Sequence, residues 1–316
     1  MFNIGLTILY EDLCPEWLKL CRDNGISDLC IHKIAVPGAD SIGELLIQLS
    51  APGGFRLIDE LNDAGVETPF QLHALEWLLP RQLFDNHPEW FRMDENGKRT
   101  PDLNLCASSR PALDMISQRT YHLAGALKQR SNRYHLWLDD AKGGSCHCPD
   151  CKKLNSSDQY LKILSAILHG LRARNSKAEL SFLSYGTVLD VPTKKPEKGI
   201  FLEFAPMDRD HDLPLNSPDP RGRKYIELLG KLKTVFDIEE AEVLEYWLDD
   251  ALYSGYKLPP VKVPFNEEVC RADCVLYREA GFKTIRSFAS FIGADYFELH
   301  GKPPIAEYVA AVVGGN

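Results

Sequence analysis

The residues of this chain that are best suited to chemistry are carboxylates, histidines and aromatic side chains that follow short apolar segments. Two acidic pairs, Asp139-Asp140 and Asp249-Asp250, each come directly after a segment that contains a tryptophan. A carboxylic acid in such a pair can donate a proton, and its neighbour can orient a polar group. Carboxylates beside tryptophan and tyrosine rings are typical of carbohydrate sites, because sugars offer C–H faces to the rings and hydroxyl groups to the polar side chains.

We therefore predict an acid pair and a set of binding residues around it. The predicted catalytic residues are Asp139 and Asp140. The predicted substrate-binding residues are His32, His73, Trp77, Trp137, Tyr185, Asp208, Arg209, Glu245, Trp247 and Asp249. The chain has no Gly-x-Ser-x-Gly sequence, and no Gly-x-Gly-x-x-Gly sequence follows a predicted strand, which disfavours a serine hydrolase of that type and a dinucleotide-binding fold. We expect no cofactor for catalysis.

Structural interpretations of several of these residues remain open. Either acidic pair can cap the loop or helical turn that follows it. Trp137 and Trp247 can fill a core instead of stacking on a sugar, and the two histidines can be scaffold residues. Glu203 and Glu245 lie inside predicted strands, where a buried pair with a basic residue is the alternative to a catalytic role.

The nine cysteines fall into two groups. Five lie in apolar segments and are expected in the core, namely Cys14, Cys21, Cys30, Cys270 and Cys274. The other four, Cys106, Cys146, Cys148 and Cys151, lie in predicted loops, and three of them form a Cys-x-Cys-x-x-Cys run. Thiolates at this spacing can bind a structural zinc ion, with Cys106 as the fourth ligand. A disulfide and free thiols are the alternatives, although an unexported chain normally keeps its thiols reduced.

Eight short apolar segments rich in β-branched and aromatic residues are predicted to be the strands that position these residues. They are Asn3–Leu9, Asp28–Ile34, Thr68–Leu75, Arg133–Asp139, Glu179–Tyr185, Ile200–Ala205, Glu242–Trp247 and Thr284–Phe288. Helices are predicted between them at Pro15–Asn24, Phe55–Ala64, Pro111–Gln129, Asp158–Arg174, Arg221–Phe236 and Glu267–Ala280. The pattern over Val191–Gly199 is weaker, so the fifth helix is expected to be short, displaced or missing.

This alternation of strands and helices, without a linker, predicts a single (β/α)8 TIM barrel over residues 1–316. The loops Trp77–Arg110 and Asp140–Ser157, after the third and fourth strands, are much longer than the usual length of about two to six residues. Long loops after barrel strands belong to the catalytic face, where the predicted site residues also fall.

The composition narrows the function further. Hydrophobic residues at 44% and charged residues at 26% of 316 exclude a disordered or fibrous chain. The net charge is −9 and no basic stripe is present, so we expect no nucleic-acid partner. We expect no membrane partner either, since no apolar run is long enough to span one, and without an export signal the expected location is cytoplasmic. The oligomeric state is left open.

Longer motifs carry a family resemblance. They are His87-Pro-Glu-Trp-Phe-Arg-Met-Asp-Glu-Asn-Gly-Lys-Arg99, Leu105-Cys106-Ala-Ser-Ser, Asp139-Asp140 with Gly143-Gly144-Ser-Cys146-x-Cys148-x-x-Cys151, Ala205-Pro206-Met-Asp208-Arg209-Asp-His211-Asp-Leu-Pro214, and Glu245-Tyr-Trp247-Leu-Asp249-Asp250. Together they resemble the barrel of glycoside hydrolase family 163, also catalogued as domain of unknown function 4838. The resemblance implies an endo-β-N-acetylglucosaminidase acting on N-glycan-type substrates, with a retaining mechanism in which the substrate's acetamido carbonyl attacks.

We therefore expect a glycoside hydrolase that binds carbohydrate. One residue of the pair Asp139-Asp140 would protonate the leaving oxygen, and the other would orient the acetamido group. In a conventional mechanism with two carboxylates, the second would be Asp249, Glu245 or Asp208. There are two alternatives. One is a glycosidase of another sugar specificity that uses two carboxylates, and the other is a catalytically silent carbohydrate-binding barrel.

Overall fold

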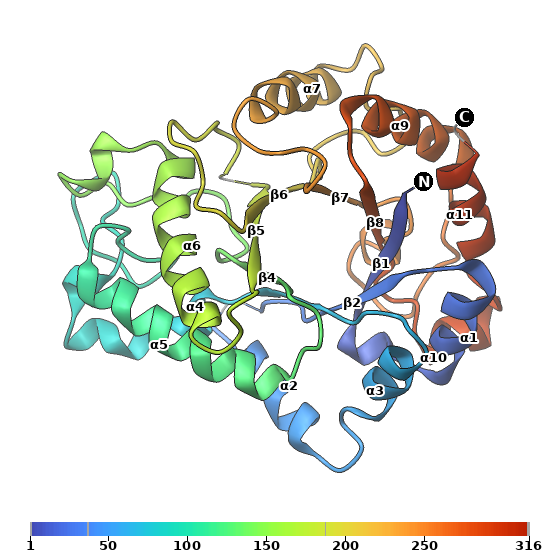
Figure 1. Ribbon diagram of the computed structural model, residues 1–316, viewed down its shortest axis with the longest axis horizontal. Helices are drawn as coiled ribbons and strands as arrows, with labels where there is room; N and C mark the ends of the chain where they lie inside the picture. Colours follow the sequence, from blue (N-terminus) through green and yellow to red (C-terminus); the bar gives the residue numbers. More distant parts are fainter. Residues whose placement is uncertain (1, 37, 187, 315–316) are drawn as a thin grey trace. The chain divides into compact units, whose positions relative to one another are not determined.

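The computed structural model describes residues 2–36, 38–186 and 188–314, which contain eight strands. The strands are β1 (Asn3–Leu9), β2 (Asp28–His32), β3 (Phe70–His73), β4 (Arg133–Trp137), β5 (Glu179–Ser184), β6 (Ile200–Phe204), β7 (Glu242–Glu245) and β8 (Thr284–Phe288). They form a closed barrel in sequence order, and most of them are labelled in Figure 1. Strand pairs such as β1 with β2 and β7 with β8 are parallel. The prediction of a (β/α)8 barrel is confirmed.

Helices connect most of these strands. They are α1 (Pro15–Asn24), α2 (Ser41–Ser50), α3 (Arg56–Asp63), α4 (Leu75–Leu78), α5 (Arg110–Leu127), α6 (Ser156–Arg172), α7 (Pro220–Leu232), α8 (Asp250–Tyr253), α9 (Glu267–Ala280), α10 (Ala294–His300) and α11 (Ile305–Val313). Short 3₁₀ helices cover Tyr10–Asp12, Arg81–Asp85, Pro88–Trp90 and Cys151–Lys153. Between β5 and β6, residues 185–186 and 188–199 contain no helix, as the weak pattern there indicated. Within the described ranges, no helix is long and apolar enough to cross a membrane.

The predicted elements are present with small differences at their ends. α1 and α9 match their predicted bounds, and α1 begins with Pro15 and ends before Gly25, whose φ of 67° suits glycine. The third strand ends at His73, two residues earlier than predicted. The chain turns into α4 there, because Leu75 and Leu78 bury their side chains on a single helical turn.

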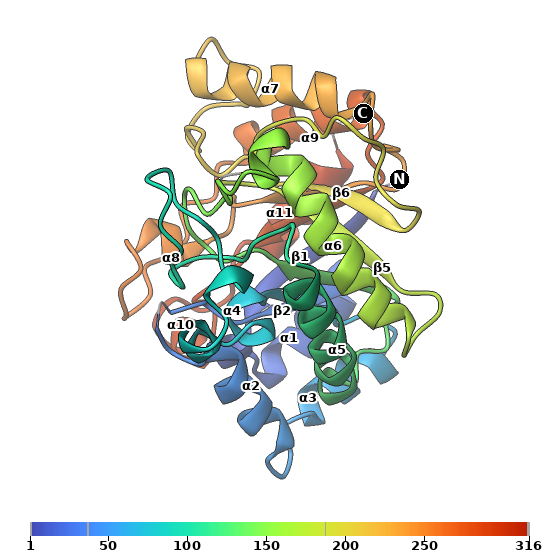
Figure 2. The ribbon, with the colours of Figure 1, turned by 90° about the vertical axis from the view of Figure 1, so that its left-hand side faces the viewer.

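Residues 33–49 and 70–201 form one of two compact units of the chain. This unit contains β3, β4 and β5, and its helices α5 and α6 lie side by side (Figure 2). Gly170 of α6 permits the close approach, since a Cβ atom at this position would lie 2.1 Å from the backbone oxygen of Ser117 in α5. The two long loops of the predicted catalytic face both belong to this unit.

Residues 1–32, 50–69 and 202–316 form the other unit. Here α9 packs against α11, and the Tyr308 hydroxyl of α11 donates a hydrogen bond to the Gly5 carbonyl at 3.1 Å. Arg286 of β8 forms ion pairs with Asp28 and Glu242, and all three side chains are buried. The pairing offsets the cost of burying these charges. That residues 1–316 form a single domain stays a prediction.

Candidate active site

Asp139 follows β4, and three hydrogen bonds hold its carboxylate. Oδ1 accepts one from the Glu76 amide at 3.0 Å, and Oδ2 accepts the others from the Arg81 guanidinium and the Asn104 amide. The Asp139 and Arg81 side chains are only 10% and 14% exposed, so water screens their attraction weakly. Three donors, one of them charged, suit a carboxylate that carries no proton.

Asn104 connects the loop after β3 to the loop after β4. Its amide donates to the Asp139 side chain, and its own Oδ1 accepts a hydrogen bond from the Asp139 amide at 2.9 Å. Its Nδ2 also donates to the Gly144 carbonyl at 3.2 Å. The backbone of Asn104 has a φ of 48°, a conformation that asparagine tolerates better than most residues. Neither Asn104 nor Arg81 is recognisable as a site residue from the sequence, because both lie far from β4 in the chain and carry no local motif.

Asp140, the second residue of the pair, has a different environment. It is exposed, and its Oδ1 accepts a hydrogen bond from the Tyr185 hydroxyl at 3.0 Å. The two adjacent carboxylates therefore differ, since Asp139 is fixed by an ion pair and backbone amides whereas Asp140 is open to a substrate or to water.

A hollow in the same unit begins at Asp139. The hollow is also lined by the polar side chains of His73, Asn104 and Tyr185 and by the aromatic side chain of Trp137. It encloses about 300 Å³, including space that is open to solvent. Trp137 is fixed because its Nε1 donates to the Ser181 hydroxyl at 3.0 Å, and the His73 ring meets it edge-on with centroids 5.1 Å apart. The structure thus brings together His73, Trp137, Asp139 and Tyr185 as predicted neighbours.

A second hollow of about 260 Å³ shares His73 with the first and is lined by Glu76, Trp77 and Asp40. Burial raises the pKa of Glu76, with a further contribution from the nearby Asp139 charge and an opposing one from Arg81. The Arg119 guanidinium lies over the ring of Trp77, 4.2 Å from the ring centroid. The Trp77 side chain is half-buried and lines the hollow.

Three other predicted binding residues pack against α9 instead. Glu245 accepts a hydrogen bond from the Tyr277 hydroxyl, while Arg209 and Trp247 both donate to Asp273, at 2.6 and 3.1 Å. Glu245, Arg209 and Trp247 are 0%, 3% and 2% exposed. Burial raises the pKa of Glu245 to about 7. The three side chains therefore form a buried network with α9, and a role in substrate binding stays a prediction.

The chain after β7 differs from the predicted seventh strand. β7 ends at Glu245, two residues before the predicted end at Trp247, so Trp247 lies in the turn that follows the strand. Tyr246 stacks on Phe288 with ring centroids 5.3 Å apart, and the His211 ring lies 5.7 Å away. Polar and aromatic residues follow one another closely here, so the sequence does not fix which of them contact α9.

The remaining predicted residues also belong to the unit of residues 1–32, 50–69 and 202–316. His32 is buried, and its ring meets Phe288 edge-on at 5.4 Å. Asp208 is exposed, and its amide donates to the Tyr225 hydroxyl. Asp249 precedes α8 and is only 5% exposed, and burial raises its pKa to about 7.

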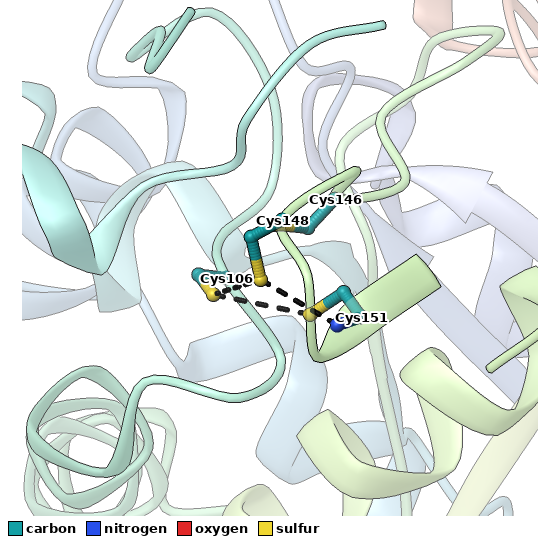
Figure 3. A group of neighbouring side chains, drawn as sticks. All are labelled: Cys106, Cys146, Cys148 and Cys151. Carbon is teal, nitrogen blue, oxygen red and sulfur yellow. Dashed lines mark hydrogen bonds between the residues drawn. The ribbon is translucent and has the colours of Figure 1, made fainter. Parts of the chain in front are cut away.

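The four loop cysteines form one buried cluster (Figure 3). Their sulfur atoms all lie within 4.8 Å of one another. All nine cysteines lie within the described residues, and none of them forms a disulfide. The five cysteines predicted in the core are also buried. The loop cluster has the ligand type and number of a zinc site.

The family of the chain follows from a comparison with family models. The model described as "Domain of unknown function (DUF4838)" matches residues 55–249, which is well over half of the chain. The chain belongs to the DUF4838 family. The DUF4838 match includes β3, β4 and β5, the first hollow and all four loop cysteines. No protein with a curated description matches this DUF4838 member significantly.

Several solved structures share the barrel of this DUF4838 chain. The cellulose synthase subunit Z (CcsZ) of Clostridioides difficile has 11% identity and a TM-score of 0.55, with 99% of this chain and 100% of the other covered. PbGH5A, a glycoside hydrolase family 5 enzyme of Prevotella bryantii, has 12% identity and a TM-score of 0.56, with 99% and 96% covered. A GH5-4 endoglucanase of Bacteroides salanitronis has 12% identity and a TM-score of 0.54, with 99% and 93% covered. At these identities the likeness shows the fold.

Proposed function

We propose that this DUF4838 protein is a glycoside hydrolase that cleaves β-N-acetylglucosaminide linkages by a substrate-assisted, retaining mechanism. The observation that carries the proposal is the unequal pair after β4, in which a bound carboxylate, Asp139, adjoins an open one, Asp140. Such a mechanism needs one carboxylate that stays ionised and one that exchanges a proton.

Asp140 is the proposed general acid. Its exposed carboxyl group accepts a hydrogen bond from the Tyr185 hydroxyl, and among the described residues it forms no ion pair that would have to break during proton transfer. A sugar bound over this exposed carboxyl group would bring its leaving oxygen within reach of Asp140. Asp140 then protonates the leaving oxygen as the glycosidic bond breaks, and its carboxylate later takes a proton from the attacking water.

Asp139 is the proposed orienting residue. An ionised carboxylate has about four acceptor positions, and residues in the described part of the chain fill three of them. The fourth is available for the N–H of an acetamido group. When the acetamido oxygen attacks the anomeric carbon, the resulting ring carries a positive charge on the former amide, and the adjacent negative charge stabilises it.

The walls of the first hollow support a sugar ligand. His73, Asn104 and Tyr185 offer hydrogen-bonding groups, and Trp137, which is only 2% exposed, also lines the hollow. The family resemblance seen in the sequence and the occurrence of this barrel in glycoside hydrolases support the same reaction class. The substrates of those neighbours do not indicate the sugar, since PbGH5A was crystallised with a xyloglucan oligosaccharide.

One observation favours a second candidate, a conventional glycosidase with two carboxylates. Burial raises the pKa of Asp249, which follows β7, to about 7, a value suited to proton transfer near neutral pH. Glu245 is a weaker candidate for the second carboxylate, because it contacts Tyr277 of α9.

The test compares two aryl substrates, the β-N-acetylglucosaminide and the β-glucoside, together with a glycoprotein carrying N-glycans. Substrate assistance predicts turnover of the acetamido sugar and strong inhibition by its thiazoline analogue. Turnover of the glucoside at a similar rate would refute the substrate-assisted mechanism and favour the two-carboxylate one. Binding of glycans without turnover of any substrate would leave only the carbohydrate-binding alternative.

A further inference from the structure

The second chemical feature of this chain is its cluster of four cysteines. We propose that Cys106, Cys146, Cys148 and Cys151 bind one structural zinc ion, which joins the loop after β3 to the loop after β4. The proposal does not depend on the function proposed above, because it concerns metal content and loop order. Figure 3 shows the four side chains converging from two separate stretches of chain.

The distances between the sulfur atoms fit a tetrahedral site. Four thiolates at the usual Zn–S distance of about 2.3 Å have sulfur atoms about 3.8 Å apart. The Cys106 sulfur lies 3.7 Å from that of Cys148 and 3.9 Å from that of Cys151. A disulfide needs about 2.05 Å, so these atoms are too far apart to be bonded and close enough to share one ion.

The surroundings of the cluster suit negatively charged sulfur. The Met93 amide donates to the Cys146 sulfur at 3.3 Å, and the Cys151 amide donates to the Cys148 sulfur at 3.5 Å. The Arg99 guanidinium lies 3.8 Å from the Cys146 sulfur. Four thiolates and a zinc ion carry a net charge of −2, and donors of this kind stabilise such a charge and orient its ligands.

The completeness of the ligand set indicates a structural role. All four cysteines are buried, with exposed fractions between 0% and 4%. Four sulfur ligands fill a tetrahedral zinc site and leave no position for water or substrate, unlike catalytic zinc sites, which keep one position open. The ion would therefore stabilise the loops and take no part in bond cleavage.

The connection to the candidate active site runs along the chain. Asn104 precedes Cys106 by two residues, and Gly144 precedes Cys146 by two residues. Asn104 contacts both Gly144 and Asp139, so the two stretches that the zinc ion would hold together are the two that fix Asp139. Loss of the metal should therefore loosen the Asp139 carboxylate.

The first experiment measures metal and thiols in the same preparation. Protein purified without added metal should contain about one zinc ion per chain by elemental analysis, and after unfolding with a chelator it should show all nine thiols. If the metal is stripped, the reduced chain should take up one equivalent of added zinc. Failure to bind added zinc would overturn the proposal, and a count of two fewer thiols would assign a disulfide instead.

The second experiment uses cobalt and a matched pair of variants. Cobalt bound by the metal-free wild-type chain should show the intense sulfur-to-cobalt charge-transfer absorption of thiolate ligands. If this absorption is absent, the four cysteines do not bind the metal, and this conclusion does not depend on whether any variant folds. Cys148→Ser should lose the metal, whereas Cys21→Ser, the same change at a buried cysteine of α1, should keep it. Equal metal content in both variants would also overturn the proposal.

Discussion

The two residues of the acid pair should respond differently to the same substitution. Asp139→Asn and Asp140→Asn each replace one carboxylate oxygen by an amide nitrogen and leave the volume nearly unchanged. We expect both to lower turnover, but only Asp139→Asn to lower the melting temperature. The reason for this difference is the ion pair between Asp139 and Arg81, which Asp140 does not share.

The magnitudes follow from the contacts. Asp139→Asn leaves the mostly buried Arg81 without its counter-charge, and one of the bonded amides loses its acceptor. Hydrogen bonds to charged groups contribute about 1.5–3 kcal/mol each, and the remaining amide oxygen recovers part of the loss, so we expect a destabilisation of about 3 kcal/mol. For a chain of this size this corresponds to a fall of about 4 °C in melting temperature. Asp140→Asn removes one exposed hydrogen bond and should change the melting temperature by less than about 1 °C.

The assay combines thermal melting with turnover of the aryl β-N-acetylglucosaminide. Loss of a general acid typically lowers the rate by a factor of about 10² to 10⁴, which is expected for Asp140→Asn at unchanged stability. Asp102→Asn is the matched control, because it removes an Arg92-paired carboxylate from the loop after β3 without touching either hollow. Near-normal turnover of Asp140→Asn, or equal melting temperatures for both variants of the pair, would refute the assignment of roles.

Two further predictions concern binding and pH. Trp77→Ala should weaken saccharide binding and leave the unfolding free energy nearly unchanged. Trp247→Ala should lower the unfolding free energy by about 3–5 kcal/mol, because the buried indole of Trp247 packs beside α9. Equal effects of the two variants on the unfolding free energy, measured by denaturant unfolding, would contradict this prediction. Burial raises the pKa of Asp12 to about 7, so the folded chain favours the neutral form of this carboxyl group. The stability that the neutral form contributes is lost as the pH rises from about 4 to about 7. Wild-type protein should therefore lose up to about 4 kcal/mol relative to Asp12→Asn over that range, and a constant difference in unfolding free energy would refute the reasoning.

The sequence by itself determined the barrel and singled out the four loop cysteines. Each strand of a parallel barrel is covered by helices on its outer face, so strands appear as short apolar runs between helical patterns, and the order of these runs fixes the fold. The Cys-x-Cys-x-x-Cys run also needs no tertiary information, because three of its sulfur atoms are neighbours in the chain. The pair Asp139-Asp140 was recognisable for the same reason, as adjacent residues at one strand end.

Only the tertiary structure decided what each side chain contacts. The pairing of Asp139 with Arg81 joins residues 58 positions apart, and no local pattern records a contact over that distance. The contacts of Glu245 and Trp247 with α9 join residues 32 and 26 positions apart, which a local pattern does not record either. The unequal environments of two adjacent aspartates arise in the same way, because their partners come from loops that only the folded barrel brings together.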